Sequence, residues 1–308
     1  MNKPASIFTR QAIIHLLVIY LVWGSTYLAI RIGVRDGSGF PPFFLGGTRA
    51  LTASLLLFAW NVFKGSRLRL TKQEILPLVL SGLALWLGGN GFIMVGEKYV
   101  DSGLTALIIA GVPLITAIIE SVLDKKPLSP VLLIFIMIGI AGIAVLSVPN
   151  FRSGVQTDIF GTVMILLGSL FWSIGTLIQS RNRLTLAPTV NSAYQMLFGG
   201  AAFILAALLL REPLPTPRLD AWLAWGYLVV FGSIIAFTSY VKVLHLLPTK
   251  IVMTYSYINP IVALILGYLI LSEPITIWTI AGTILVLLGV FGVFSFHRRE
   301  VKIQPVKT

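Results

Sequence analysis

The chain has 308 residues, of which 56% are hydrophobic and 11% are charged. A soluble domain carries roughly 25% charged residues, so this chain lacks the polar side chains that would cover a water-facing surface. The composition therefore excludes a soluble domain and predicts an integral membrane protein.

Apolar runs of helical length follow one another along the whole chain. Crossing the hydrocarbon core takes about 20 residues, and each run is of about that length. Alternating polar strands are absent, so helices rather than a barrel are expected to satisfy the backbone. The breaks carry Pro, Gly and charge, as at residues 40–42 and 212–215. We predict an all-α protein with ten transmembrane helices, near 12–34, 41–63, 75–96, 102–123, 130–148, 159–180, 189–210, 222–244, 250–271 and 276–296.

The second half of the chain repeats landmarks of the first. Pro113 recurs as Pro260 after 147 residues, and the Trp of Leu21-Val22-Trp23 has a counterpart in Leu170-Phe171-Trp172. Landmarks that keep one spacing over this length indicate a duplication.

The duplication predicts the organisation of the chain. We expect two five-helix repeats, in residues 1–150 and 151–297, and a basic tail in residues 298–308. Five spans are an odd number, so the second repeat enters the membrane from the opposite side. Inverted repeats of this kind are a common plan of secondary transporters, which hold the substrate near the middle of the membrane where the repeats meet.

The net charge of +12 is distributed unevenly over the predicted loops. With a cytoplasmic N-terminus, most of the 23 Lys and Arg residues fall on the inner side. Positive loops favour the cytoplasm, so we expect both termini there. The basic tail is more typical of a topology and anionic-lipid signal than of a nucleic-acid site. The expected partner is therefore the lipid bilayer and not nucleic acid.

The sequence lacks the residues of an enzyme or a metal site. It contains no Cys, and its three His residues lie close to predicted span ends. We find no nucleophile and base at matching depth, and so we expect no catalytic residue, no metal and no cofactor. Glu120 is the only carboxylate inside a predicted span. A buried proton relay is therefore disfavoured, and movement down a gradient is the simpler expectation.

Repeat-matched prolines indicate helix breaks in the fourth and ninth spans. Pro113 and Pro260 lie near the centres of these spans, where a missing N–H and a ring clash weaken a helix. Gly111 beside the first and Asn259 beside the second favour local unwinding. Freed carbonyls at this depth must face protein or a water-filled cavity. We expect both spans to line a solute path; the alternative is a pair of packing kinks.

Aromatic side chains mark the first, sixth and eighth spans. Trp23 and Trp172 lie mid-span, away from the interfaces where Trp is usually found. A deep indole N–H needs a partner or a polar cavity. Thr176, one turn beyond Trp172, and Tyr240, near the inner end of its span, are further candidates. Their alternatives are a hydrogen bond within the helix and an interfacial anchor.

Amide side chains add a second group of candidates. Trp86 and Asn90 are four residues apart and so share a helix face, as do Tyr255 and Asn259, which Tyr257 flanks. An amide that faces lipid is costly, so both Asn residues are expected to face inward. They either contact a ligand or form a hydrogen bond between helices.

We assign Arg49 and several glycines to roles other than solute binding. Arg49, a few residues into the second span, is expected to reach outward or pair with Glu97, in a structural or gating role. Its counterpart in the second repeat, Gln195, is uncharged. Small residues on the fifth and tenth spans, such as Gly142 and Gly289, indicate a scaffold or a dimer surface. The sequence leaves a monomer or a homodimer open.

Together, the ten spans, the inverted repeats, the Trp-bearing first helix and the Pro-bearing fourth helix resemble the drug/metabolite transporter superfamily, EamA type. The turn Ser272-Glu273-Pro274 is similar to the Gly-Glu-type turn after the fourth helix of this family, whereas Lys125-Lys126-Pro127 departs from it. Within the superfamily the chain resembles YddG-type bacterial exporters of aromatic amino acids. The resemblance implies a protein of the bacterial inner membrane, with a central cavity that opens alternately to each side.

We therefore expect an exporter of neutral amino acids, aromatic ones included, and related metabolites, working by facilitated diffusion. A proton-coupled exporter of drugs or other metabolites is the alternative. A channel is disfavoured because the predicted polar lining is sparse. Phosphorylated solutes are disfavoured because phosphate binding calls on Lys or Arg, and no such residue is expected at the centre.

Overall fold

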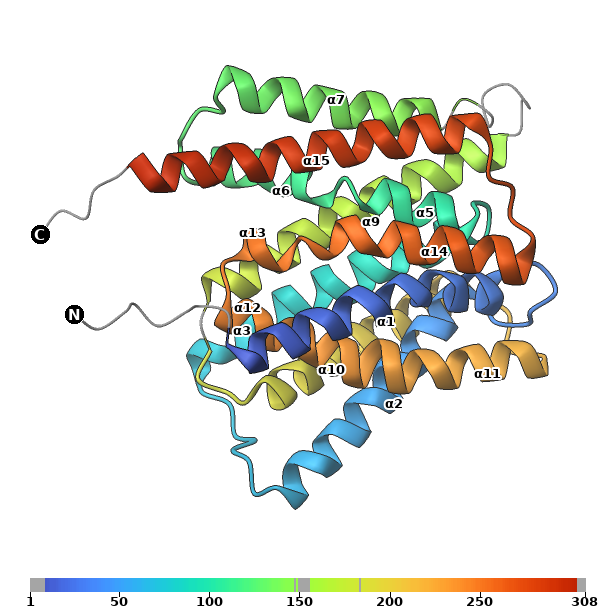
Figure 1. The fold of residues 1–308 in the computed structure, drawn as a ribbon. Helices are drawn as coiled ribbons and strands as arrows, with labels where there is room; N and C mark the ends of the chain where they lie inside the picture. The colour runs from blue at the N-terminus through green and yellow to red at the C-terminus, as the bar shows by residue number, and fades with distance from the viewer. Residues whose placement is uncertain (1–8, 147, 149–155, 183, 304–308) are drawn as a thin grey trace, which may run out of the picture.

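The computed structural model of the chain describes residues 9–146, 148, 156–182 and 184–303, and within them every regular element is a helix (Figure 1). The helices lie side by side as one bundle; most run roughly along its length, whereas α2 is inclined to the others (Figure 1). The described chain begins and ends at the same end of the bundle (Figure 1). A bilayer core offers no hydrogen-bond partners to backbone N–H and C=O groups. Each apolar segment therefore satisfies these groups internally, as a helix.

The helix ends lie close to the predicted ones. In the first half the elements are α1 (Arg10–Val34), α2 (Pro42–Phe63), α3 (Lys72–Gly82), η1 (Leu83–Gly91), α4 (Phe92–Glu97), α5 (Ser102–Ile109), α6 (Val112–Leu123) and α7 (Pro130–Leu146). In the second half they are α9 (Gln156–Arg181), α10 (Pro188–Leu209), α11 (Leu219–Tyr227), η2 (Leu228–Phe237), α12 (Thr238–Leu246), α13 (Thr249–Val252), α14 (Tyr255–Leu271) and α15 (Ile277–Ile303). The last helix thus continues into the segment that was predicted to be a tail.

Length and hydropathy separate the helices of the described chain into two groups. Seven are long and apolar enough to cross a membrane, counting α3 to α4, α5 to α6 and α11 to α12 as single helices. Three shorter apolar helices cover Pro130–Leu146, Ile258–Leu271 and Ile277–Gly292. The fold is therefore that of a multi-pass membrane protein.

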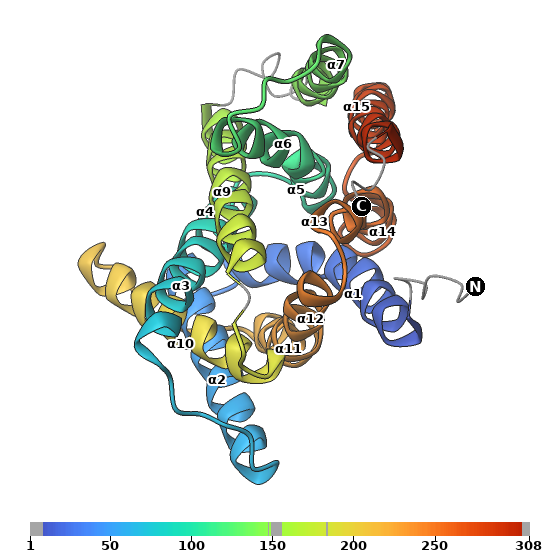
Figure 2. The same cartoon turned by 90° about the vertical axis from the view of Figure 1, so that its left-hand side faces the viewer.

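Two helix pairs flank the central part of the bundle. In the end-on view, α7 and α15 lie together at one edge, and α2 and α10 lie at the opposite edge (Figure 2). Glycines allow the first pair to pack closely: a Cβ on Gly289 would lie 2.6 Å from the backbone N of Gly139, and one on Gly142 would lie 2.6 Å from the N of Val286. These glycines therefore face each other within one chain, as the scaffold alternative predicted.

The fourth span breaks where the sequence predicts, but the ninth does not. Helix α5 ends before Gly111, and Pro113 lies in the first turn of α6, where its missing N–H costs nothing. In the ninth span the break falls between α13 and α14, at Met253 and Thr254, and Pro260 lies inside α14. The expected unwinding beside Asn259 is therefore wrong. Pro260 removes one backbone hydrogen bond near the start of α14, just after the break that precedes this helix.

Two π-helical segments, η1 and η2, interrupt the third and eighth spans. A π turn is wider than an α turn and is common at functional sites. In η1 the glycines allow close contact with α9: a Cβ on Gly88 would lie 2.6 Å from Phe171, and one on Gly89 would lie 3.0 Å from Trp172. These glycines of η1 therefore form a packing surface for α9.

Carboxylates join the two halves at the end of the bundle that carries residues 35–41, called here the Gly37 end. Glu212 accepts hydrogen bonds from the backbone N–H groups of Phe43 and Phe44, at 3.1 and 3.0 Å, at the start of α2. Burial raises the pKa of Glu212, although these two bonds oppose the effect. Glu273 accepts from the N–H groups of Ser102 and Gly103 at 2.9 and 3.0 Å. Each acid thus caps the N-terminus of a helix in the other half. Anionic groups are favoured at helix N-termini.

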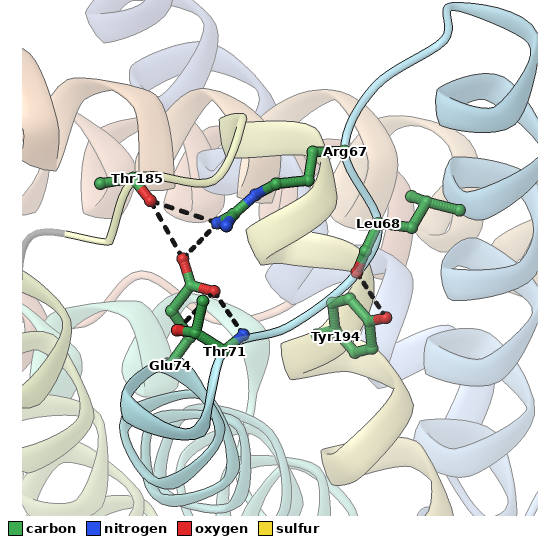
Figure 3. Close-up of polar contacts among 6 residues, drawn as sticks. All are labelled: Arg67, Leu68, Thr71, Glu74, Thr185 and Tyr194. Atoms are coloured by element: carbon green, nitrogen blue, oxygen red, sulfur yellow. Dashed lines mark hydrogen bonds and ion pairs between the residues drawn. The ribbon is translucent and has the colours of Figure 1, made fainter.

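The opposite end, called the Arg67 end after the loop of residues 64–71, is joined by a different network (Figure 3). Glu74 accepts from the backbone N of Thr71 at 2.9 Å, which closes a capping box at the start of α3. Its carboxylate also contacts Arg67 and accepts from the hydroxyl of Thr185 at 3.1 Å. Because Thr185 lies between α9 and α10, Glu74 connects a loop of the second half to the first.

We predict that Glu74→Ala lowers the melting temperature of the purified protein by a few degrees. The change removes the cap and leaves the partners of a buried carboxylate unsatisfied, a loss of about 1–3 kcal/mol. Thermal unfolding in detergent measures it. Asp36→Ala is the matched control, because the Asp36 carboxylate is 90% exposed and its ion pair with Lys98 spans 3.6 Å. An equal shift in both variants would show that the Glu74 network contributes no more than a surface pair.

Candidate functional site

A small cavity lies inside the bundle, between helices of both halves. Its wall comes from α1, α2, η1, α4, α5 and α6 on one side and from α9, η2 and α14 on the other. The lining residues are mostly apolar or aromatic, with a few neutral polar groups and one cation: Trp23, Thr26, Tyr27, Ile30, Arg49, Trp86, Asn90, Ile93, Ile109, Val112, Ser169, Trp172, Gly232, Phe237 and Tyr255.

Four aromatic side chains from four helices meet at one side of this cavity. The ring centroids of Trp23 and Trp172 are 5.3 Å apart in an edge-on arrangement, and Trp23 lies 4.9 Å from Tyr240 and 5.3 Å from Tyr255. Trp172 lies 5.5 Å from Tyr240. Such contacts are favourable beyond the area they bury. We call these four residues the aromatic cluster.

Most polar atoms of the aromatic cluster have partners within the protein. Trp172 Nε1 donates to the hydroxyl of Tyr255 at 3.1 Å, and Trp23 Nε1 makes a long contact of 3.4 Å with the carbonyl of Gly232 in η2. The hydroxyls of Tyr240 and Thr176 contact each other, and Thr176 also donates to the carbonyl of Trp172 at 2.8 Å. These bonds fix the orientation of the rings.

The structure brings some of the predicted site residues to the cavity and places others behind it. Trp23, Trp86, Asn90, Trp172 and Tyr255 line the wall. Thr176 and Tyr240 are fully buried and are not among the lining residues; Tyr240 belongs to the aromatic cluster, and its hydroxyl contacts that of Thr176.

The remaining predicted residues lie elsewhere. Gly111 lines a separate apolar groove, together with Ile143 and Leu166. Pro113 is buried in α6 beside Val112, and Pro260 is buried in α14. Tyr257 belongs to α14, but its side chain lies outside the part of the chain that the structure describes.

The two asparagines bond to helix backbones. Asn90 donates from Nδ2 to the carbonyl of Leu85 at 3.1 Å, across a turn of the π-helical segment. With its amide oriented to donate, Asn259 reaches the carbonyls of Tyr20 at 2.8 Å and of Tyr255 at 3.2 Å. Asn259 therefore links α14 to α1, the helix-to-helix alternative. Asn90 faces the cavity while it satisfies a carbonyl of its own helix.

Arg49 lines the cavity, although the sequence predicted a structural or gating role for it. It is only 3% exposed, donates from Nε to the hydroxyl of Ser233 at 2.7 Å, and lies over the ring of Trp86 at 5.3 Å. It therefore neither reaches outward nor pairs with Glu97 in the described structure. The signal in the sequence was its depth: an arginine several residues inside a span is usually functional.

Glu97 also differs from its expected setting. The sequence placed it at the end of a span, as a possible partner of Arg49, and its side chain is fully buried. Among the described residues, neither of its carboxylate oxygens has a hydrogen-bond partner. Sequence position along a helix did not reveal this burial, because the neighbouring helices that cover Glu97 come from distant parts of the chain.

The cavity is nearly closed in this conformation. It holds about 50 Å³ of free space, which is room for a few water molecules, since each needs roughly 10–15 Å³. A larger solute must displace side chains of the wall to enter. Among the described residues, no group of three or more His, Cys, Asp or Glu side chains is placed to hold a metal ion.

An all-helical, multi-pass bundle with an aromatic-lined cavity between its halves is the architecture of a membrane transporter. The sequence comparisons agree with this class. A model of the EamA-like transporter family matches residues 10–148 and again residues 159–295. The chain therefore belongs to the EamA-like transporter family, and it is a membrane transporter.

Relatives and a solved structure extend the comparison. The uncharacterized inner membrane transporter YedA of Escherichia coli K12 is 34% identical over 297 residues, which cover 94% of both chains. The uncharacterized transporter YoaV of Bacillus subtilis is 23% identical over 94% of this chain and 99% of its own. A crystal structure with 20% identity superposes with a TM-score of 0.68 over 94% of this chain and 98% of the other. That likeness establishes the shared fold.

Proposed function

We propose that the protein is a secondary transporter that moves neutral amino acids, aromatic ones included, across the bacterial cytoplasmic membrane by alternating access. The observation that carries the proposal is the aromatic cluster beside a small cavity between the two halves. Aromatic rings at this depth offer stacking faces to a ring of the solute. Neutral hydroxyl and amide groups in the same wall offer hydrogen bonds.

We further propose that the chain crosses the membrane ten times, as two inverted five-helix repeats in residues 1–150 and 151–297, with both termini in the cytoplasm. Two observations support this arrangement. Helices α1 and α9, the first of each half, run in opposite directions (Figure 1). The loop of residues 64–71 at the Arg67 end carries Lys64, Arg67 and Arg69, as expected for a cytoplasmic face.

Exposed positions at the two ends test this orientation in intact cells. Because the chain has no Cys, Lys64→Cys and Asp36→Cys each introduce a single thiol, at the Arg67 end and at the Gly37 end. We expect a membrane-impermeant maleimide to label Asp36→Cys in whole cells and Lys64→Cys only after permeabilisation. The reverse pattern would place both termini outside.

The two ends of the bundle offer the closures that alternating access requires. Glu212 and Glu273 tie the halves together at the Gly37 end, and Glu74 ties them at the Arg67 end. In the proposed cycle the cavity opens to one side when the ties of that side release. The direction of net movement then follows the solute gradient, and export is the expected physiological direction.

Glu97 favours a second candidate function, a proton-coupled exporter of drugs or other metabolites. A buried carboxylate without a hydrogen-bond partner within a transporter is a candidate proton-binding group. Glu120, the other acid considered, is only partly buried on α6. The two functions differ in one observable, which is whether a pH gradient drives accumulation.

Uptake by proteoliposomes tests both candidates. We predict saturable uptake of labelled phenylalanine or tryptophan that is the same with and without a pH gradient. Trp172→Ala should lower this uptake by about tenfold or more, because it removes ring contacts with Trp23 and Tyr240 that are worth roughly 0.5–1.5 kcal/mol each. Trp172→Phe keeps a ring but loses the bond to Tyr255, and should have an intermediate effect.

The controls separate the outcomes. Trp60→Ala is a matched control, because this indole is 51% exposed on the outside of α2. Gradient-driven accumulation that is lost in Glu97→Gln would support the proton-coupled candidate. Vesicles with correctly inserted protein that take up no amino acid would contradict the proposed substrate class.

A further inference from the structure

The guanidinium of Arg49 lies in the cavity wall with part of its hydrogen-bonding capacity unused. Nε donates to Ser233, and the group lies over the ring of Trp86. The terminal nitrogen NH1 is buried and has no hydrogen-bond partner among the described residues. A buried polar N–H without a partner costs free energy, and a buried charge costs more. The position therefore calls for an acceptor that the described protein does not provide.

No carboxylate of the described chain forms an ion pair with Arg49. The arginine pairs found there join Arg31, Arg35, Arg67, Arg181 and Arg218 to acids near the two ends of the bundle. The oxygens of Glu97 accept no hydrogen bond from the described residues, Arg49 included.

A second unused donor lies in the same wall. Trp86 is fully buried, and its indole Nε1 has no hydrogen-bond partner. Both Arg49 NH1 and Trp86 Nε1 are donors, and neither side chain has an acceptor atom. Two open donors, one of them cationic, match a ligand group that only accepts hydrogen bonds and carries negative charge.

The corresponding position of the second half shows that packing does not require this charge. Gln195 on α10 is the counterpart of Arg49 and is also fully buried. Its Nε2 donates to the hydroxyl of Ser81 at 2.7 Å and to Oε1 of Gln179 at 2.5 Å. Its Oε1 is buried without a hydrogen-bond partner among the described residues, but a neutral amide occupies this position. Arg49, by contrast, places a cationic side chain in the cavity wall.

We propose that Arg49 and Trp86 form a subsite that binds the carboxylate of the solute, so that the transported class consists of organic monocarboxylates, amino acids among them. Arg49 is the one cation among the described lining residues, which suits a single negative charge better than a phosphate. The aromatic cluster then contacts the side chain of the solute. This inference rests on the proposed function and names the substrate group that Arg49 selects.

Competition binding on the full-length protein in detergent tests the subsite. Labelled phenylalanine is displaced by unlabelled phenylalanine or by phenylalaninamide, which carries a neutral carboxamide in place of the carboxylate. We expect phenylalanine to bind about 10- to 100-fold more tightly than the amide, as for a charge-assisted bond. Arg49→Met should abolish the difference, and Arg49→Lys should restore only part of it, because a lysine cannot reproduce the arginine fork.

Two further variants keep the test conclusive. Arg69→Met makes the same chemical change at an exposed loop position, and should leave the preference for the carboxylate intact. If Arg49→Met does not fold, Ser233→Ala removes the anchor of Nε while keeping the arginine, although it also removes the hydrogen bond to the carbonyl of Leu228. That change should weaken phenylalanine binding several-fold and leave the affinity for the amide unchanged.

The outcomes separate this inference from the proposed function. Equal affinities for phenylalanine and its amide, together with measurable phenylalanine uptake, would overturn the carboxylate subsite and leave amino-acid transport standing. Arg49-dependent binding of phenylacetate but of no amino acid, measured as a thermal shift, would support the subsite and contradict amino-acid transport. No shift with any carboxylate tested would overturn the inference.

Discussion

The buried contact among Trp23, Trp172, Tyr240 and Tyr255 is the interaction on which the candidate site depends. It joins α1 of the first half to α9, α12 and α14 of the second. In a membrane, helices gain little from burying apolar surface against one another, because lipid is equally apolar. Specific ring contacts and hydrogen bonds therefore carry much of the association at this point. The same contacts form one side of the cavity.

The backbone around the cavity follows from the cost of unsatisfied groups in an apolar medium. A helix can widen or break there only where other groups satisfy the freed carbonyls. In η1 the amide of Asn90 reaches the carbonyl of Leu85, and in η2 the hydroxyl of Ser233 reaches the carbonyl of Leu228 at 2.9 Å. Ser233 is also the anchor of Arg49. Ser233 thus connects the π-helical backbone of η2 to Arg49, the one cation of the described wall.

Much of the fold was predictable from the sequence. Spans end where Pro, Gly and charge interrupt the apolar runs, so hydropathy alone placed most helix ends within a few residues. The depth of Trp23 and Trp172 identified two members of the aromatic cluster, because an indole at mid-membrane needs a partner. The deep Arg49 gave a similar signal, but its partner Ser233 lies on a distant helix that only the fold brings near.

Other features could not be read from a linear pattern. The π-helical turns of η1 and η2 arise from tertiary packing, and the sequence predicted regular helices there. The break before Tyr255 lies several residues from Pro260, since the whole helix, rather than the proline alone, determines where unwinding costs least. The burial of Glu97 depends on neighbours from other spans, and a position at the end of a span suggested exposure.

Alternating access requires that the solute-binding cavity between the two halves open to one end of the bundle at a time. Distances between spin labels test it most directly, because the chain has no native Cys. One labelled pair, at Lys98 and Leu219, reports on the Gly37 end, and another, at Lys126 and Leu246, reports on the Arg67 end. On addition of saturating phenylalanine, we expect one pair to move apart while the other approaches. Distances that stay unchanged at both ends, with phenylalanine bound, would contradict it.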